Sequence, residues 1–265
     1  MIENPKSLRV KKAAALARKK ERQAQGRFLV EGPQAVRELL AFRPELAEIV
    51  FATMGTESWQ HEIDRLASDA DVALERVTEP VLAAMAETIT PQGVIAVART
   101  WESSLADVFA GARLVAILHE VRDPGNAGAV LRAADAAGAD AVVFAGESID
   151  PFHPKVVRST TGSLFHLPVA VAPDLASAVD AARAAGVTTL AADVRGDELL
   201  AARSEGVLDG PVAWVFGNEA RGLSEAERGL TDRSLKLPIY GAAESLNLAT
   251  AASVLIYETA FAQRS

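Results

Sequence analysis

Residues 113–146 read RLVAILHEVRDPGNAGAVLRAADAAGADAVVFAG, and this stretch decides the fold. An apolar run at 113–120 is followed by Asp123 and Pro124, which form a helix-start signal, then by alanine-rich helical sequence and a second apolar run at 140–146. Further runs of this kind, mostly separated by helical segments, lie at 165–171, 187–193, 212–217 and 234–239. Buried strands that alternate with helices indicate a parallel sheet with helices on both faces. The sequence therefore predicts the α/β class for the C-terminal region.

The composition indicates a globular protein of one large or two ordinary domains. The chain has 265 residues, of which 49% are hydrophobic, and it contains no cysteine. The absence of cysteine excludes disulfides, thiolate metal sites and cysteine nucleophiles. No apolar run approaches the roughly 20 residues that a membrane span requires, and the charged N-terminus does not resemble a secretion signal. We therefore expect a cytoplasmic protein without a membrane span or a metal.

The charge is distributed unevenly along the chain. The formal net charge is −8, but residues 1–30 hold nine cationic and two acidic side chains, a balance of +7, which leaves −15 for the remainder. A basic segment on an acidic body is an electrostatic signature of phosphate binding. We expect a basic N-terminal arm at 1–26 that contacts nucleic acid; a solvated helix that maintains solubility and a transit peptide are the alternatives. The cations expected to contact RNA are Lys11, Lys12, Arg18, Lys19, Lys20 and Arg22.

A separate α/β pattern precedes the parallel-sheet region. Strand candidates at 27–32, 47–52, 71–77 and 93–99 alternate with helical stretches at 33–42, 57–68 and 79–88. The apolar pattern then breaks. We therefore expect a small α/β domain at 27–100, a linker at 101–112 and the larger domain at 113–265.

Three loops of the larger region carry glycine and polar residues where ligands of parallel sheets bind, beyond the carboxyl ends of strands. They read DPGNAGAVLRAADAAG (123–138), WVFGNEARGLS (214–224) and LPIYGAAESLNLATAASVLIYE (237–258). Neither the glycine-rich dinucleotide pattern nor a P-loop is present. In order and spacing the three stretches resemble the motifs of the SpoU/TrmH family of RNA ribose 2′-O-methyltransferases. Residues 153–169 resemble the family's intervening segment.

The resemblance implies a fold, a reaction and partners. It implies a SPOUT domain with a deep trefoil knot, preceded by a ribosomal-protein-like RNA-binding domain that RFLVEGPQAVRELL (27–40) and the arm resemble. It implies methyl transfer from S-adenosylmethionine to a ribose 2′-hydroxyl of structured RNA, with 23S ribosomal RNA as the favoured substrate. It also implies that the enzyme is a homodimer. The alternatives are a transfer RNA substrate, a catalytically silent RNA-binding or ribosome-assembly protein, and an α/β enzyme for a small molecule, which leaves the basic arm unexplained.

The first motif supplies the central catalytic candidate. A helix that begins near Asn126 places Gly128 and Arg132 on one face, with Val130 and Leu131 toward the sheet. Arg132 resembles the family's catalytic arginine, whereas a surface ion pair with Asp135 is the structural alternative. Because a guanidinium stays protonated, we expect Arg132 to clamp a phosphate; His119, Glu219 and Ser245 are candidates for accepting the proton. The full catalytic set is Asn126, Arg132, Glu219, Ser245 and Asn247.

The second and third motifs resemble the cofactor side of the family's site. Ser245 and Asn247 resemble a polar pair near the transferred methyl, and N-capping of the last helix is their structural alternative. Arg158 and Ser159 resemble an RNA-contact segment, with a surface loop as the alternative. The residues expected to bind the cofactor are Gly217, Asn218, Leu237, Ile239 and Leu246.

Overall fold

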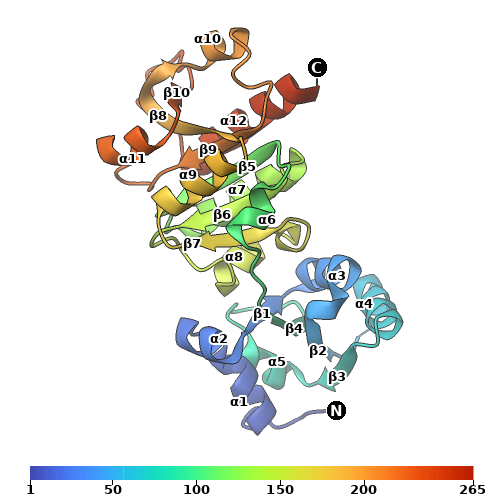
Figure 1. The fold of residues 1–265 in the computed structure, drawn as a ribbon. Helices are drawn as coiled ribbons and strands as arrows, with labels where there is room; N and C mark the ends of the chain where they lie inside the picture. The colour runs from blue at the N-terminus through green and yellow to red at the C-terminus, as the bar shows by residue number, and fades with distance from the viewer. Residues whose placement is uncertain (56, 265) are drawn as a thin grey trace. The chain divides into compact units, whose positions relative to one another are not determined.

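The computed structural model describes residues 1–55 and 57–264, which form two compact units (Figure 1). The first contains Met1–Trp101 and Phe152–His166; the second contains Glu102–Pro151 and the chain from Leu167 onward. Within the described residues, no helix has both the length and the apolar character needed to cross a bilayer.

The second unit is built on a six-stranded sheet. The strands are β5 (Leu114–His119), β6 (Ala141–Ala145), β7 (Val169–Ala172), β8 (Thr188–Glu198), β9 (Val212–Phe216) and β10 (Arg233–Lys236). Their order is β10-β8-β9-β5-β6-β7, and every pairing is parallel. The predicted parallel sheet is therefore confirmed. The strand expected from 165 begins later because residues 163–165 form a 3-10 helix, η2 (Ser163–Phe165).

Two pairs of helices cover this sheet. α7 (Pro124–Ala136) follows β5 and packs beside α12 (Leu248–Arg264), whereas α9 (Leu175–Ala184) follows β7 and packs beside α6 (Leu105–Phe109). The β5-to-β6 and β7-to-β8 connections cross the sheet in opposite directions, so right-handed crossovers place the two pairs on opposite faces. Two short helices complete the unit, α10 (Leu199–Ser204) and α11 (Glu225–Leu230).

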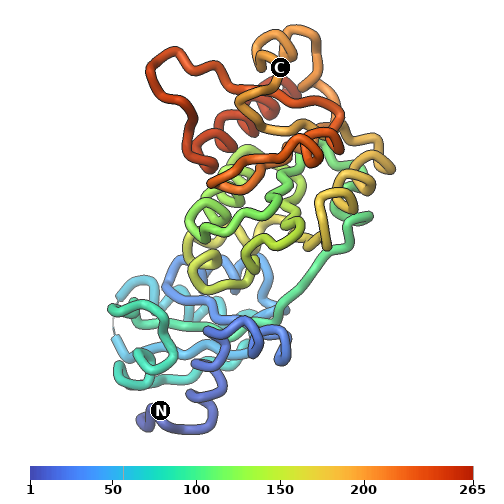
Figure 2. Tube along the Cα trace, turned by 90° about the vertical axis from the view of Figure 1, so that its left-hand side faces the viewer, coloured from blue at the N-terminus to red at the C-terminus, as the bar shows by residue number. Residues whose placement is uncertain are grey.

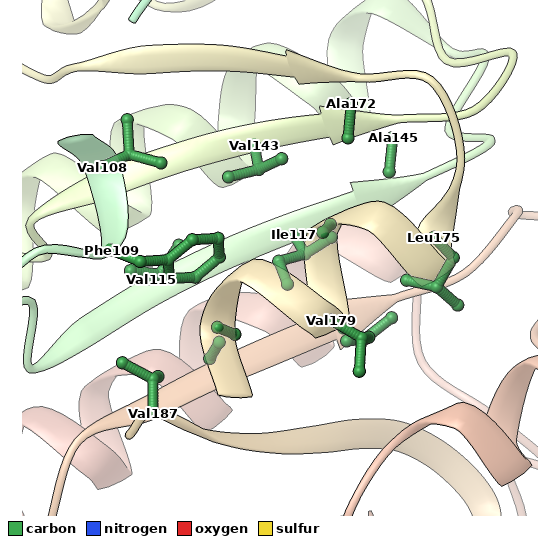
Figure 3. Packing of buried hydrophobic residues seen from close by; sticks show 14 of the residues in the cluster. Val108, Phe109, Val115, Ile117, Val143, Ala145, Ala172, Leu175, Val179 and Val187 are labelled. Atoms are coloured by element: carbon green, nitrogen blue, oxygen red, sulfur yellow. The ribbon is translucent and has the colours of Figure 1, made fainter. Parts of the chain in front are cut away.

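The core beneath α9 shows why these apolar runs form strands. Leu175 and Val179 of α9 lie over Val115 and Ile117 of β5 (Figure 3), and all four side chains are buried. Because successive strand residues point to opposite faces, the strand residues that alternate with Val115 and Ile117 point to the face covered by α7 and α12. Both faces need apolar side chains, which explains the continuous apolar runs.

The first unit has a four-stranded sheet of order β1-β4-β2-β3. Its strands are β1 (Arg27–Glu31), β2 (Ala47–Thr53), β3 (Ala73–Val77) and β4 (Val94–Arg99). β4 is antiparallel to both of its neighbours, and β2 is parallel to β3. The helices of this unit are α1 (Leu8–Ala15), α2 (Lys19–Gln25), α3 (Pro33–Phe42), η1 (Pro44–Leu46), α4 (Ser58–Asp69), α5 (Glu79–Met85), α8 (Pro154–Ser159) and η2 (Ser163–Phe165).

The basic N-terminal segment is an integral part of this unit rather than an appended arm. Val10, Ala13 and Leu16 are buried with residues of α5 and the sheet. The backbone N–H of Ile2 donates to the carbonyl of Arg76 at 2.8 Å. The segment therefore contributes to the core of the domain that follows it.

The structure differs from the expected division of the chain at two further places. α6 lies inside the expected linker and packs with α9 in the second unit. Residues 152–166, within the region expected to be catalytic, belong to the first unit. Phe152 and Phe165 pack there against Phe28 and Trp101, with ring centroids between 4.9 and 6.5 Å apart. Aromatic packing, which no local pattern reports, therefore assigns this segment to the first unit.

Candidate active site

A cavity of about 440 Å³ lies at the carboxyl ends of β8, β9 and β10. β9 and β5 are neighbours in the sheet, but the chain leaves β5 toward β6 on one side and leaves β9 toward β10 on the other. Ligands of parallel sheets usually bind at the carboxyl ends of two such strands. Glu219 and Ser245, two of the catalytic candidates, line the cavity. So do all five predicted cofactor residues, Gly217, Asn218, Leu237, Ile239 and Leu246. Long-range folding therefore brings the second and third motifs to one cavity.

The lining fits S-adenosylmethionine in size and in chemistry. The volume lies in the range of small-molecule sites, and apolar Leu235 and Leu255 face it together with charged Arg195 and Arg221. An apolar wall suits a purine and charged groups suit an amino-acid moiety. A Cβ on Gly217 would lie 2.7 Å from the backbone of Gly222, so glycine permits the close turn of the second motif.

A bulge in β8 builds one wall of this cavity and was missed at the sequence level. Ala191 pairs with Ser234 and Asp197 pairs with Leu235, so residues 192–196 loop out of the ladder. Gly196 permits the bulge, because a Cβ there would lie 2.5 Å from the Ser234 carbonyl. The signal was the sequence ADVRG directly after an apolar strand.

The bulge presents an ion pair to the cavity. Arg195 donates from Nε and Nη2 to the two carboxylate oxygens of Asp193, each at 2.9 Å. Burial opposes ionisation of this half-enclosed carboxyl, but hydrogen bonds from Arg195 outweigh it and lower the pKa of Asp193. The wall is therefore charged but internally paired.

Glu219 joins the second motif to the first. Its carboxylate accepts hydrogen bonds from the backbone N–H of Arg122 at 3.2 Å and of Asp123 at 3.0 Å. The side-chain amide of Asn126 donates to the same carboxylate at 3.4 Å. A carboxylate beside the first N–H groups of α7 also interacts favourably with the helix dipole. Glu219 thus holds the start of α7.

Asn247 joins the third motif to the first. Its Oδ1 accepts from the backbone N–H of Ala249 at 2.9 Å and of Thr250 at 3.3 Å, so it caps α12. Its Nδ2 donates to Oδ1 of Asn126 at 3.0 Å. Asn247 therefore performs the capping role and also positions Asn126.

The first motif agrees with one expectation and differs from another. α7 begins at Pro124, as the start signal at Asp123 and Pro124 predicted, and so two residues before Asn126; Asp123 caps it by accepting the Asn126 N–H at 2.7 Å. Gly128, expected on the face of Arg132, is buried. Arg132 is exposed, and within the described residues its guanidinium forms no ion pair.

His119 is not placed as a proton acceptor for this cavity. The side chain is 5% exposed at the end of β5, and its Nε2 lies 2.8 Å from Oε1 of Glu227. Hydrogen bonds from Arg221 hold the pKa of Glu227 far below its usual range. His119 is absent from the cavity lining, unlike Glu219 and Ser245.

Within the described chain, no group of three His, Asp or Glu side chains is arranged to hold a metal ion.

The structure separates the predicted RNA contacts. Arg22 is 2% exposed and donates to the carbonyls of Leu16 and Ala17 at 3.0 and 2.8 Å. It satisfies carbonyls at the end of α1, so the expected role in RNA binding is corrected to a structural one. The other predicted cations of this segment, Lys11, Lys12, Arg18, Lys19 and Lys20, are exposed.

Arg158 and Ser159 are half-buried rather than part of an open surface loop. Arg158 lies 3.7 Å from the carboxylate of Glu31, and the Ser159 hydroxyl donates to the carbonyl of Val156 at 2.9 Å. Both residues lie in the segment that belongs to the first unit.

Comparisons with known proteins agree with this geometry. Residues 113–257 match the SpoU rRNA Methylase family, and residues 7–96 match the MRM3-like substrate binding domain. The chain is 37% identical over 258 residues to the 23S rRNA (guanosine(2553)-2′-O)-methyltransferase RlmP of Bacillus subtilis, covering 97% of each chain.

Solved structures agree as well. The AdoMet-bound rRNA methyltransferase of Sinorhizobium meliloti has a TM-score of 0.84 and 29% identity, covering 97% of this chain and 96% of that one. AviRb of Streptomyces viridochromogenes in complex with the cofactor AdoMet has a TM-score of 0.81 and 30% identity, covering 97% of this chain and 99% of that one. This chain belongs to the SpoU rRNA methylase family, with an MRM3-like substrate-binding domain at its N-terminal end.

Proposed function

We propose that this protein transfers a methyl group from S-adenosylmethionine to a ribose 2′-hydroxyl of 23S ribosomal RNA. The observation that carries the proposal is the hydrogen-bonded junction of Asn126, Glu219 and Asn247, which joins the three motifs beside a cavity of cofactor size. The named activities of RlmP and the 23S rRNA methyltransferase of Streptomyces viridochromogenes support the substrate class.

The residues divide the work between binding and positioning. S-adenosylmethionine, when bound, supplies an electrophilic methyl carbon on a sulfonium sulfur. The lining residues Leu237, Ile239 and Leu246 would hold it, with backbone approach at Gly217. Positioning of an in-line hydroxyl oxygen then contributes much of the rate.

Asn126 is suited to orient the ribose or its phosphate. Its Oδ1 accepts from Asn247, and one N–H of its amide donates to Glu219. An amide nitrogen has a second N–H, which is available for a substrate oxygen. Because both partners of Asn126 are themselves anchored, the amide is held before the RNA arrives.

Arg132 would stabilise the negative charge that develops at the 2′-oxygen rather than accept the proton of the 2′-hydroxyl. A fixed guanidinium beside a phosphate lowers the cost of forming the alkoxide at the 2′-oxygen. The proton passes to another group, and Glu219 and Ser245 are the two proposed acceptors that line the cavity. Glu219 already accepts hydrogen bonds from three N–H donors, so its two carboxylate oxygens are engaged at the start of α7.

The experiment is transfer of labelled methyl from S-adenosylmethionine to purified 23S ribosomal RNA, intact ribosomal subunits and transfer RNA, followed by digestion to nucleosides. We expect the label in a 2′-O-methyl nucleoside of the ribosomal RNA. Label in transfer RNA alone would replace the substrate. No label together with no cofactor binding would support the silent RNA-binding alternative.

The basic helices α1 and α2 are proposed to contact the RNA backbone. Because the segment is part of the core, charge removal tests this better than deletion. Replacing Lys11, Lys12, Lys19 and Lys20 with glutamine should weaken binding to 23S ribosomal RNA. The slope of log K against log salt should become shallower by about 3, at roughly 0.7–0.9 per lost phosphate contact.

The matched control replaces the same four lysines with arginine, which preserves the charge. Fluorescence anisotropy at several salt concentrations measures both variants. An unchanged slope in the glutamine variant would return these helices to a solubility role.

We propose that the enzyme acts as a homodimer through α12. Val254, Tyr257 and Phe261 are 42%, 37% and 55% exposed and lie at helical spacing on this helix. Light scattering should give twice the chain mass of 27.9 kDa, and Val254→Asp with Phe261→Asp should give the monomer. A wild-type monomer at micromolar concentration would contradict the proposal.

Two further features of the family are proposed for this chain. The trefoil knot is expected in the region that leads from β9 through the loop before α12, whose path is visible in Figure 2. A cytoplasmic location accords with a ribosomal RNA substrate.

A further inference from the structure

Arg221 lines the cavity and stands at the centre of a group of paired side chains to which no role in the reaction has been assigned. Its Nη1 and Nη2 donate to the two carboxylate oxygens of Glu227 at 2.7 and 2.8 Å. Its Nη2 also donates to Oε2 of Glu120 at 2.8 Å. Such a two-pronged pairing fixes both the position and the plane of a guanidinium.

The two carboxylates lie on different elements. Glu120 directly follows β5, and Glu227 lies in the first turn of α11, where it forms a capping box with Ser224. Glu227 also contacts the buried ring of His119. Arg221, in the loop between β9 and α11, therefore ties this loop to the end of β5 and to the start of α11.

A second tie joins the same loop to the same turn. The side-chain amide of Asn218 donates to the backbone carbonyl of Glu120 at 2.9 Å. Glu120 has a φ of 52°, in the left-handed region that residues other than glycine rarely adopt. Its unusual backbone is thus held from both its carbonyl and its side chain, three residues before the cap of α7.

Glu219 lies between these two ties in the sequence. Its carboxylate accepts from the backbone N–H groups of Arg122 and Asp123 and from the Asn126 amide. We propose that Arg221 is a positioning residue for methyl transfer, which holds the loop of the second motif against β5 and so sets where Glu219 holds the start of α7. The inference rests on the proposed function and adds a residue to its machinery.

The pairing of Arg221 argues against a role in clamping RNA phosphate. Its terminal nitrogens are engaged by two carboxylates, and Nη1 also lies 3.4 Å from the carbonyl of Gly222. A phosphate would have to displace a carboxylate from the guanidinium. Arg132, which is exposed and has no ion pair within the described chain, is the residue suited to that task.

The test compares Arg221→Gln with a matched control, Arg233→Gln. Arg233 of β10 also pairs with two carboxylates in this unit, those of Glu205 and Asp197, but it does not line the cavity. Arg221→Gln should lower the single-turnover methyl-transfer rate about 10- to 100-fold, as expected for a misplaced site. The rate is measured at saturating S-adenosylmethionine, because Arg221 also lines the cofactor cavity. The affinity for 23S ribosomal RNA should remain near wild type, and Arg233→Gln should match wild type throughout.

A double-mutant cycle separates positioning from general stabilisation. If Arg221 acts through Glu219, adding Arg221→Gln to Glu219→Gln should change the rate by less than about twofold. Arg221→Lys should recover part of the rate, since an ammonium keeps a charge but lacks the fork. Rates that multiply in the double variant would overturn the proposal, as would an Arg221→Gln variant with the wild-type rate.

Amide hydrogen exchange gives a readout that needs neither cofactor nor RNA. Exchange at Arg122 and Asp123 should accelerate in Arg221→Gln and remain unchanged in Arg233→Gln. Uniform acceleration over β5 and β6 would make Arg221 a stability residue and overturn the proposal. A wild-type protein that methylates no RNA would refute the proposed function, whereas the exchange result would still decide the role of Arg221.

Discussion

Replacing Arg132 with alanine should lower the methyl-transfer rate by about 10²- to 10³-fold, the effect typical of removing one preorganised group that stabilises developing charge. The side chain projects into solvent from α7, whose first turn is held by Glu219. No described ion pair is lost with it, so the fold and the cavity should be unaffected. Single-turnover transfer measures the effect, and calorimetry with S-adenosylhomocysteine should give the wild-type affinity.

Two variants sharpen the assignment of Arg132. Arg132→Lys should recover only part of the rate, because a point charge lacks the planar donor fork that matches phosphate. Arg183→Ala removes another exposed arginine, from α9 on the opposite face of the sheet, and should leave the rate unchanged. Normal methylation by Arg132→Ala would contradict the catalytic role.

Replacing Trp214 with alanine should cost about 3–5 kcal/mol in the free energy of unfolding. Trp214 lies in β9, the strand that leads into the second motif, and its side chain is fully buried. Its indole N–H donates to Oγ1 of Thr259 in α12 at 2.8 Å, so it also links the sheet to the last helix. Urea denaturation followed by far-ultraviolet circular dichroism measures the loss.

The hydrogen bond can be separated from the packing. Thr259→Val keeps the shape but leaves the indole N–H unpaired, which should cost about 1–3 kcal/mol. The double variant Trp214→Phe/Thr259→Val contains no unpaired indole N–H. Its loss in the free energy of unfolding should therefore be smaller than the sum of the losses in the two single variants. Additive costs would show that this hydrogen bond contributes little.

Local pattern was sufficient for most elements of the fold. The apolar runs at 113–120 and 140–146 became β5 and β6, and the helix predicted at 33–42 is α3. These elements are predictable because burial on one or both faces imposes a spacing that neighbouring residues reveal. The cavity residues were predicted from the resemblance of the three motifs to a known family, whereas the hydrophobic periodicity alone does not identify them.

Hydrogen-bond and packing partners that lie far apart in the sequence could not be predicted from local pattern. Arg22 was expected to contact RNA but donates to the carbonyls at the end of α1, because the N–H groups of a guanidinium can bind carbonyl oxygens as well as phosphate. The bulge at 192–196 depends on where β10 pairs, and the place of residues 152–166 depends on aromatic contacts with Phe28 and Trp101.

The sequence by itself determined the α/β class, the parallel sheet, the family and the cavity-lining motifs. Only the tertiary structure decided which side chains complete the site. Asn126 lies 93 residues from Glu219 and 121 from Asn247, and Arg221 lies 101 from Glu120. Periodicity reports whether a residue is buried, whereas hydrogen-bond partners are set by the pairing of distant strands and loops, so these junctions appear only when the chain is folded.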